Sequence, residues 1–383
     1  MYRKALTLLL SLALLLTVSV TAAQDDDPQN VDFFLTFVPN VQFAPLYVAI
    51  ENGYTAEQNI EITIEHGDEN VGVDLIAAGR IPFGMISGEQ VLLARANDRP
   101  VVFVYEWFQE YPVGIVVPDT SGITDITEIA GRDVGIPGRF GATYSGLTAL
   151  LAAINLTEDD ISLEPIGFAA PDVVCTGRLD ASVIYVNNEP LQIAQRAEDG
   201  ECADISSVEV IRVADYVDLV SNGITTSEDV IAENPELVTA MVAAFDAGLT
   251  DTINNPAQAY LHSLAYVDNL PADEDFIAAL EAASEAQIAF LGTDPDRDAI
   301  AQSRADLMSI LEQNYSPETL IQFRVLLATI DLWDAEELGV SDLESWEITR
   351  DVLTDMALIE TELDVEAAFS NDFLPAMMEE MDE

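Results

Sequence analysis

Three kinds of side chain recur directly after the predicted strands of this sequence: aromatic rings, amides and carboxylates. Aromatic rings provide flat stacking faces, whereas amides and carboxylates donate and accept hydrogen bonds. This combination suits a planar, nitrogen-rich small molecule, and open α/β sheets bind such ligands beyond the carboxyl ends of their strands. We assign no catalytic residue. The candidate ligand contacts are Asn40, Gln42, Phe43, Tyr47, Asp68, Ser87, Glu106, Trp107, Phe108, Gly138, Arg139, Phe140, Thr143, Tyr185, Asn188 and Glu189.

Some of these candidates have a more specific expected role. We expect the ring of Trp107 or Phe108 to stack on the ligand, because both residues lie in a polar loop. We expect the Glu189 carboxylate to accept hydrogen bonds from ring N–H or hydroxyl groups. The turn at residues 138–141 precedes a helix whose first N–H groups would face the cleft, a geometry that suits an acceptor oxygen or an anion.

Ordinary structural roles stay open for several candidates. Phe43 and Tyr47 fit a hydrophobic core equally well, and Arg139 fits a surface ion pair. The glycines of residues 138–141 fit a tight turn with no further function. Residues 188–190 also fit a strand end, since a proline restricts the residue before it.

The elements that must position these residues alternate between short apolar runs and helical patterns, as in a mainly parallel α/β sheet. The first series is predicted to have strands at residues 32–37, 60–64, 82–86, 101–105 and 114–117, and helices at 43–52, 71–78 and 90–96. The second series, from Pro118, is predicted to have strands at 133–136, 161–165, 181–186 and 208–213, and helices at 144–154 and around 173–175. From residue 224 onward the pattern is almost wholly helical.

The amino terminus has the three parts of a secretory signal peptide: a basic head, an apolar run and a small-residue stretch. The apolar run of 16 residues (5–20) is short for a membrane span, which needs about 20. We expect cleavage near Ala23 and export across the cytoplasmic membrane, to the periplasm or the cell surface. An uncleaved anchor helix is the alternative. No cysteine lies directly after the apolar run, so we expect no lipid anchor there.

The charge balance is strongly acidic, with 69 acidic and 14 basic residues and a net charge of −55. Removal of residues 1–23 would take away Arg3 and Lys4 and no acid, giving −57. Nucleic acid is excluded as a partner, because phosphate contacts need clustered Lys and Arg. The acids are spread along the whole chain, which indicates a solvated surface that keeps an exported protein soluble.

Two cysteines, Cys175 and Cys202, are compatible with a disulfide. An even count in an exported protein permits one bridge, and two separate buried thiols are the alternative. The two histidines, His66 and His262, are far apart in the sequence. No Cys/His spacing for zinc exists, and we expect no metal site.

Five segments, in this order, resemble the solute-binding proteins of ABC importers for thiamine-pyrimidine precursors, a family that includes riboflavin-binding components. The segments are residues 37–53 (FVPNVQFAPLYVAIENG), 135–141 (GIPGRFG), 185–190 (YVNNEP), 215–216 (DY) and 223–226 (GITT). The resemblance covers roughly residues 31–265. The stretches 111–115 (YPVGI) and 137–144 (PGRFGATY) are most similar to the riboflavin-binding branch.

The resemblance implies a two-lobed, periplasmic-binding-protein-like α/β fold with the ligand in the cleft. Two crossing strands, at residues 117–118 and 213–216, would form a hinge that allows closure. The implied lobes are lobe 1 (31–117 plus 217–363, with a helical C-terminal extension) and lobe 2 (118–216). The residue pattern itself adds the signal peptide (1–23) and an acid-rich tail (364–383) that we expect to be loosely held.

The resemblance further implies a monomer that captures riboflavin or, alternatively, a hydroxymethyl- or formylaminopyrimidine, and delivers it to a membrane permease without a cofactor of its own. Related pyrimidine synthases depend on a cysteine-rich iron motif, a histidine and a lysine that holds pyridoxal phosphate. This sequence has no lysine after Lys4 and no cysteine cluster, so we expect a binding protein and not an enzyme. A surface adhesin or structural exported protein is the remaining alternative, but it would not need paired cleft loops.

Overall fold

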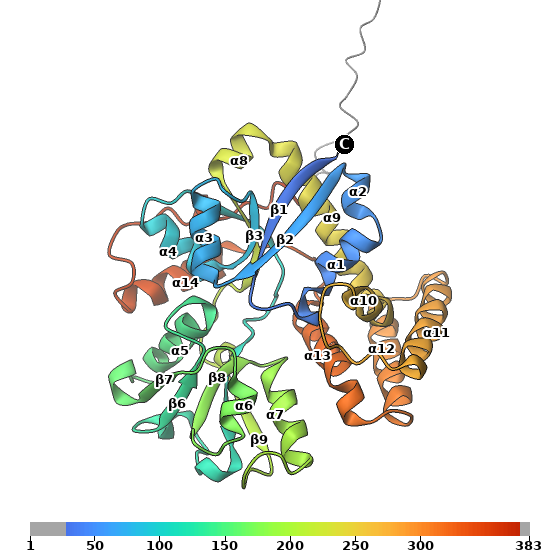
Figure 1. Cartoon of the computed structure of the whole chain (residues 1–383). Helices are drawn as coiled ribbons and strands as arrows, with labels where there is room; N and C mark the ends of the chain where they lie inside the picture. Colours follow the sequence, from blue (N-terminus) through green and yellow to red (C-terminus); the bar gives the residue numbers. More distant parts are fainter. Residues whose placement is uncertain (1–27, 376–383) are drawn as a thin grey trace, which may run out of the picture.

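The computed structural model describes residues 28–375 as two lobes, each built around a five-stranded sheet (Figure 1). The strand order is β2-β1-β3-β10-β4 in the first lobe and β7-β6-β8-β5-β9 in the second. The predicted two-lobed α/β fold with a helical extension is confirmed. The predicted signal peptide (residues 1–23) lies outside the described residues.

The first lobe combines four early strands with one strand that returns later in the chain. β1 pairs in parallel with β2 and β3, whereas β10 runs antiparallel between β3 and β4. The five residues of β3 are all buried, which explains its continuous apolar run. The strands are β1 (Gln29–Thr36), β2 (Ile60–Gly67), β3 (Phe83–Ser87), β4 (Val101–Glu106) and β10 (Asn222–Ser227). The helices are η1 (Val41–Phe43), α1 (Ala44–Glu51), α2 (Tyr54–Glu57), α3 (Glu69–Ala77), α4 (Gly88–Ala96), α8 (Glu228–Glu233) and α9 (Pro235–Asn254).

The second lobe is also a mixed sheet. β6 pairs in parallel with β7 and β8, whereas β5 runs antiparallel between β8 and β9. The strands are β5 (Val113–Pro118), β6 (Asp133–Ile136), β7 (Ser162–Pro165), β8 (Ala181–Tyr185) and β9 (Val208–Arg212). The helices are η2 (Asp119–Ser121), η3 (Ile126–Ile129), α5 (Gly141–Ala153), η4 (Glu158–Asp160), α6 (Ala170–Val174), α7 (Glu189–Glu198) and η5 (Val213–Asp215).

The prediction of mainly parallel sheets is confirmed, because four of the five strands in each sheet run in the same direction and one strand, β10 or β5, runs against its neighbours. One sequence-based expectation about the sheets is wrong. The predicted strand at residues 114–117 was assigned to lobe 1, whereas β5 belongs to the second sheet. All six residues of β5 are buried, so its composition fits the centre of either sheet.

The lobes are therefore joined slightly away from the predicted crossings. The first connection is residues 107–112, between β4 and β5, and not residues 117–118. The second is residues 213–221, between β9 and β10, which includes the predicted crossing at 213–216.

The helices that follow the second crossing begin at recognisable caps. The Asn234 and Asn255 side chains accept backbone N–H groups at the starts of α9 and α10, each directly before a proline. The remaining helices are α10 (Pro256–Ser263), α11 (Glu274–Leu291), α12 (Arg297–Glu312), α13 (Pro317–Trp333), α14 (Leu343–Asp355) and η6 (Glu366–Ala368).

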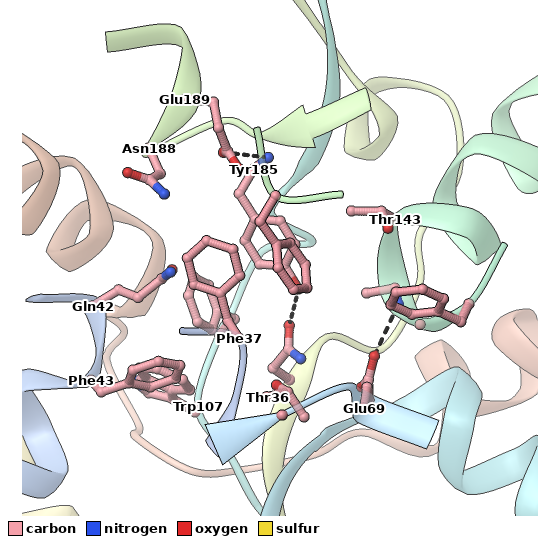
Figure 2. A pocket seen from close by; sticks show the side chains of 17 residues that line it. Thr36, Phe37, Gln42, Phe43, Glu69, Trp107, Thr143, Tyr185, Asn188 and Glu189 are labelled. Atoms are coloured by element: carbon pink, nitrogen blue, oxygen red, sulfur yellow. Dashed lines mark hydrogen bonds between the residues drawn. The ribbon is translucent and has the colours of Figure 1, made fainter. Parts of the chain in front are cut away.

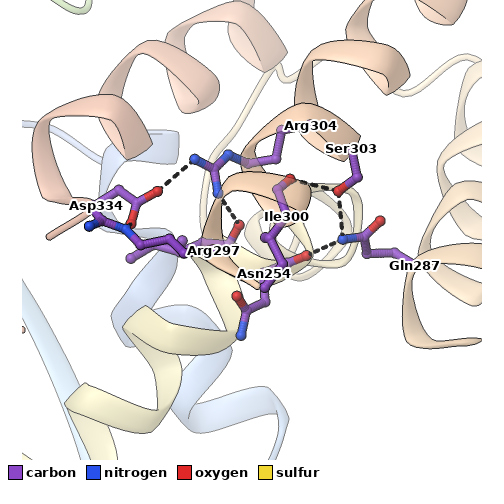
Figure 3. A network of polar contacts seen from close by, with 8 residues as sticks. Asn254, Gln287, Arg297, Ile300, Ser303, Arg304 and Asp334 are labelled. Carbon is purple, nitrogen blue, oxygen red and sulfur yellow. Dashed lines mark hydrogen bonds and ion pairs between the residues drawn. The ribbon is translucent and has the colours of Figure 1, made fainter. Parts of the chain in front are cut away.

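A buried ion pair ties the helical extension together (Figure 3). The Arg304 guanidinium on α12 donates to Asp334 Oδ2 at 2.7 Å and to the carbonyl of Ile253 at 3.2 Å. Arg297 pairs with the other carboxylate oxygen of Asp334 at 2.7 Å. These contacts join α12 to the ends of α9 and α13. Helix α13 in turn packs against both η1 of the first lobe and α7 of the second.

The acid-rich end of the chain is ordered as far as the structure describes it. The Phe369 ring stacks on Trp346 with 5.3 Å between ring centroids, and Ser370 N–H donates to the Phe103 carbonyl of β4 at 2.9 Å. Leu374 is buried in the core of the first lobe. The expectation of a loosely held tail is therefore wrong for residues 364–375, because apolar residues among the acids cover the outer edge of β4.

Cys175 and Cys202 form a disulfide between the end of α6 and the loop after α7, the pairing that their even count permits. Within residues 28–375, no helix has both the length and the apolar character needed to cross a membrane.

Candidate functional site

A cleft between the lobes contains about 620 Å³ of empty space, part of it open to solvent (Figure 2). Seven of the 17 lining residues are aromatic. The lining residues are Thr36, Phe37, Gln42, Phe43, Gly67, Glu69, Trp107, Phe108, Phe140, Gly141, Ala142, Thr143, Phe168, Tyr185, Asn188, Glu189 and Asn222.

Phe37, directly after β1, extends from the first lobe toward the second. Its φ of 102° is a conformation that bulky residues rarely adopt. The backbone is held there, because its N–H donates to Gly67 O at 3.0 Å and its carbonyl lies 3.1 Å from His66 Nδ1. Its ring meets Phe168 of the second lobe edge to face, with centroids 4.8 Å apart. Strained residues of this kind cluster at ligand clamps.

Gln42 and Phe43 enter the cleft from η1. Asn40 caps this turn, since its Oδ1 accepts the Gln42 N–H at 3.0 Å. Asn40 therefore positions the lining residues and is not itself part of the cleft wall.

Trp107 and Phe108 lie on the first crossing and are both almost fully buried. Their backbone N–H groups donate to the carbonyl of Asn222, at 3.0 and 3.1 Å, which fixes the two crossings together. Trp333 of α13 stacks on Trp107 with centroids 5.2 Å apart, so one face of the Trp107 ring is already covered. The Trp107 indole nitrogen has no hydrogen-bond partner among the described residues.

The second lobe presents the start of α5 to the cleft, as the sequence predicted for the turn before this helix. A Cβ at Gly138 would lie 2.2 Å from the Phe140 ring, so the absence of a side chain lets that ring fold over the turn. The Ala142 N–H donates to Glu69 Oε2 at 3.0 Å. The acceptor at this helix start is thus a carboxylate from the first lobe.

Tyr185, Asn188 and Glu189 line the cleft at the end of β8. Tyr185 Oη donates to Asn222 Oδ1 of the first lobe at 3.1 Å. Glu189 Oε2 accepts the Tyr185 N–H at 3.0 Å, and burial raises the Glu189 pKa to about 7. Figure 2 shows Glu189 and Asn188 on one side of the aromatic rings and Phe43 and Glu69 on the other.

Nine of the sixteen predicted residues line the cleft, and their contact with a ligand stays a prediction. Two that do not are core or support residues: Tyr47 is fully buried against Tyr266, and Ser87 donates to Glu69. Asp68 is exposed at the start of α3.

Glu106, Gly138 and Arg139 also lie outside the cleft wall. Glu106 points toward the C-terminal segment, where it accepts the Ser341 hydroxyl at 2.7 Å, and burial raises its pKa to about 8. Arg139 is exposed and forms an ion pair with Glu158. This is the surface ion pair that the sequence analysis gave as the alternative to a ligand contact for Arg139.

The sequence interpretation missed eight lining residues: Thr36, Phe37, Gly67, Glu69, Gly141, Ala142, Phe168 and Asn222. Gly67, Glu69, Gly141 and Ala142 lie directly beside a predicted residue, so in these loops the segment was right and the choice of side chain was not. Thr36 and Phe37 lie three or four residues before Asn40. Phe168 and Asn222 carry no such signal, because they come from a loop after β7 and from a strand that was not predicted.

Comparison with known proteins identifies the family of this chain. The family model described as NMT1/THI5 like matches residues 40–259, more than half of the chain. The riboflavin-binding protein RibY of Chloroflexus aurantiacus is 30% identical over 91% of this chain and 86% of its own length. A formylaminopyrimidine-binding protein of Halalkalibacterium halodurans is 28% identical over 67% of this chain and 76% of its own. A 4-amino-5-hydroxymethyl-2-methylpyrimidine phosphate synthase of Legionella pneumophila is 23% identical over 60% and 72%.

Solved structures share the fold at lower identity. The periplasmic aliphatic sulphonate-binding protein SsuA of Escherichia coli has a TM-score of 0.60 and 12% identity, covering 90% of this chain and 99% of its own. The alkanesulfonate-binding SsuA of Xanthomonas axonopodis, bound to MOPS, has a TM-score of 0.58 and 13% identity over the same shares. The chain therefore belongs to the NMT1/THI5-like family and has the two-lobed fold of the periplasmic binding proteins.

Proposed function

We propose that this protein is the substrate-binding component of an ABC importer and that it captures a planar heterocyclic vitamin, with riboflavin as the favoured ligand. The observation that carries the proposal is the cleft between the lobes, whose wall combines seven aromatic rings with amides, hydroxyls and carboxylates. The similarity to RibY over 91% of the chain supports the choice of riboflavin.

The distribution of aromatic residues in the cleft wall favours a tricyclic ring over a single pyrimidine. Aromatic side chains come from both lobes, for example Phe43 and Phe108 from the first side and Phe140 and Tyr185 from the second. Hydroxyl groups of Thr36 and Thr143 are available to a ribityl chain. A thiamine-precursor pyrimidine is the second candidate, because the formylaminopyrimidine-binding relative covers two thirds of the chain.

Recognition would combine stacking with hydrogen bonds from both lobes. An aromatic stack contributes about 0.5–1.5 kcal/mol beyond the burial of area. A hydrogen bond to a charged acceptor such as Glu189 contributes roughly 1.5–3 kcal/mol. The unpartnered Trp107 indole N–H would donate to an acceptor on the ligand.

We infer a transport role and not catalysis for this chain. The synthases among its relatives share the family, but an internal Schiff base requires a lysine and the sequence has none after Lys4. The proposal includes export through the predicted signal peptide, action as a monomer and transfer of the ligand to a membrane permease.

The test is to identify what copurifies with the protein and to titrate the ligand-free protein. We expect a yellow preparation with flavin absorbance, and quenching of flavin fluorescence when riboflavin is added. A colourless protein that gains no thermal stability with riboflavin, but a large gain with an aminopyrimidine, would reverse the ranking of the two ligands.

A further inference from the structure

The start of α5 is the part of the cleft best suited to an anion, and a carboxylate of the protein occupies it. A helix start combines N–H groups without helical partners and the positive end of the helix dipole. Phe140, at the cap position, makes no side-chain hydrogen bond to the helix. Instead, Glu69 of the first lobe accepts the Ala142 N–H at 3.0 Å.

Gly141 makes this approach possible. A Cβ at this position would lie 2.6 Å from Glu69 Oε2, and its φ of 65° also favours glycine. The other carboxylate oxygen, Oε1, accepts both the N–H and the hydroxyl of Ser87 at 2.6 Å. Glu69 is only 7% exposed, so it is fixed in place by three donors from two lobes.

A second buried acid, Glu89, lies close enough to interact with Glu69. Tyr111 Oη donates to the Ala142 carbonyl at 2.8 Å and to Glu89 Oε1 at 3.1 Å. Burial and the charge of Glu69 raise the Glu89 pKa to about 8, so Glu89 is the acid that is protonated at neutral pH. Burial also raises the Glu69 pKa, but the hydrogen bonds that its oxygens accept from Ser87 and Ala142 oppose this shift and favour the charged form of Glu69.

No cation in residues 28–375 lines the cleft to balance this charge. The chain has 14 Lys and Arg residues, and the 12 that follow Lys4 are all absent from the cleft wall. Arg139, two residues before α5, is turned outward to Glu158. His66 lies behind Phe43, and burial lowers its pKa, which favours the neutral ring.

We propose that Glu69 makes the cleft selective for uncharged ligands, so that a heterocycle carrying a phosphate, sulfonate or carboxylate group is rejected at the start of α5. A ligand anion would have to replace Glu69 at the Ala142 N–H or lie beside it. Like charges placed together in a buried site are strongly unfavourable. The inference rests on the proposed function, because it takes this cleft as the ligand site.

The test compares riboflavin with riboflavin 5′-phosphate on the wild type and on Glu69→Gln, which keeps the shape of the side chain and removes its charge. Titrations in 1 M salt, where the Debye length is about 3 Å, suppress the general repulsion from the acidic surface. We expect the wild type to prefer riboflavin by about 100-fold or more, and Glu69→Gln to narrow this preference at least tenfold. Glu61→Gln is the matched control, since Glu61 is an exposed acid of the same lobe, and it should leave the preference unchanged.

Equal affinity of the wild type for the two flavins, or an unchanged preference in Glu69→Gln, would overturn the inference while leaving the proposed function intact. If neither flavin binds any variant, riboflavin fails as the ligand, and sulfate then tests the inference directly. Sulfate should raise the Tm of Glu69→Ala and of Glu69→Gln by more than it raises the Tm of the wild type. An equal effect of sulfate on all three proteins would disprove the role of Glu69.

Discussion

Glu189 is a cleft residue whose charge changes near neutral pH. Burial raises its pKa to about 7, so it is half protonated there. If the ligand donates to its charged form, affinity falls as the pH drops from 8 to 6, by at most about tenfold per pH unit. Stability of the unliganded protein shifts the other way: a raised carboxyl pKa stabilises the fold at low pH, and this contribution is lost as the pH rises through about 7.

We therefore expect Glu189→Gln to bind riboflavin about 10- to 100-fold more weakly at pH 8 and to lose the pH dependence of affinity. Calorimetric titration at pH 6, 7 and 8 measures both effects, with Glu61→Gln as the control for net charge. If the affinity of the wild type for riboflavin stays constant across this pH range, the Glu189 carboxylate does not contact the ligand.

Replacing an aromatic cleft residue with alanine reports on ligand binding only where the ring is not also needed for folding. Trp107 is 2% exposed and stacked on Trp333, so Trp107→Ala would cost about 3–5 kcal/mol of stability. A loss of ligand affinity in this variant could then come from partial unfolding and not from a lost ligand contact. Phe37 is half-buried, and its ring meets the Phe168 ring of the other lobe edge to face. It is the better probe of how an aromatic ring retains the ligand.

Phe37→Ala and Phe37→Gly form a matched pair, because both remove the ring and only glycine relieves the backbone strain. We expect riboflavin to dissociate faster from both variants, by about tenfold if one aromatic contact is lost. We expect Phe37→Gly to be more stable than Phe37→Ala by about 1 kcal/mol, since a strained φ costs roughly 1–3 kcal/mol. Stopped-flow dissociation and urea unfolding measure the two effects. Dissociation at the wild-type rate would show that Phe37 does not hold the ligand in the cleft.

At the scale of helices and strands, periodicity predicted most of the first two hundred residues. β6 (Asp133–Ile136) has the predicted bounds, and β1 to β4 differ from theirs by at most three residues. β10 was missed because its sequence, NGITTS, is short and contains small residues that do not stand out as an apolar run. Its place between β3 and β4 depends on pairing with strands more than a hundred residues earlier, which a local pattern does not contain.

The choice between neighbouring side chains was the least predictable part of the site. Asp68 and Glu69 are adjacent acids in one loop, and the sequence interpretation selected Asp68. α3 begins at Glu69, and the direction of its first turn sends the Glu69 carboxylate into the cleft and leaves Asp68 exposed. α7 likewise begins at Glu189, where the sequence also allowed a strand end. Family membership was easier to predict than contacts, because it rests on the order of several segments along the chain and not on the direction of single side chains.

The disulfide stabilises the second lobe by joining two elements that pack on the same side of its sheet. It links residues 27 apart, and loop-closure entropy for such a length corresponds to about 3–4 kcal/mol. We expect the double variant Cys175→Ala/Cys202→Ala to lose about this much stability in urea and to keep its affinity for riboflavin, because neither residue lines the cleft. Reduction of the wild type should reproduce the loss, and equal stability of reduced and oxidised protein would contradict the expectation.

At the scale of the whole molecule, the lobes are in contact through polar groups on both sides of the cleft. Glu69 meets Ala142, Tyr185 meets Asn222, and Asn187 of the second lobe donates to Thr329 of α13 at 2.7 Å. A ligand that touches both lobes stabilises this arrangement by its differential affinity for it. Helix α13 is therefore part of the contact between the lobes, although it lies outside the cleft wall.

Thr329→Val tests this coupling without changing a cleft residue. The substitution keeps the shape of the side chain and removes the acceptor for Asn187, and both residues are buried. An unsatisfied buried amide costs about 1–3 kcal/mol, and it regains water when the lobes separate, so the open state gains population. Apparent affinity falls in proportion to the closed fraction, and we expect riboflavin to bind about 5- to 100-fold more weakly.

Thr239→Val is the matched control, because that hydroxyl donates only within the start of α9. Calorimetry together with the radius of gyration from X-ray scattering measures the shift. Wild-type affinity and an unchanged radius in Thr329→Val would mean that α13 does not contribute to closure.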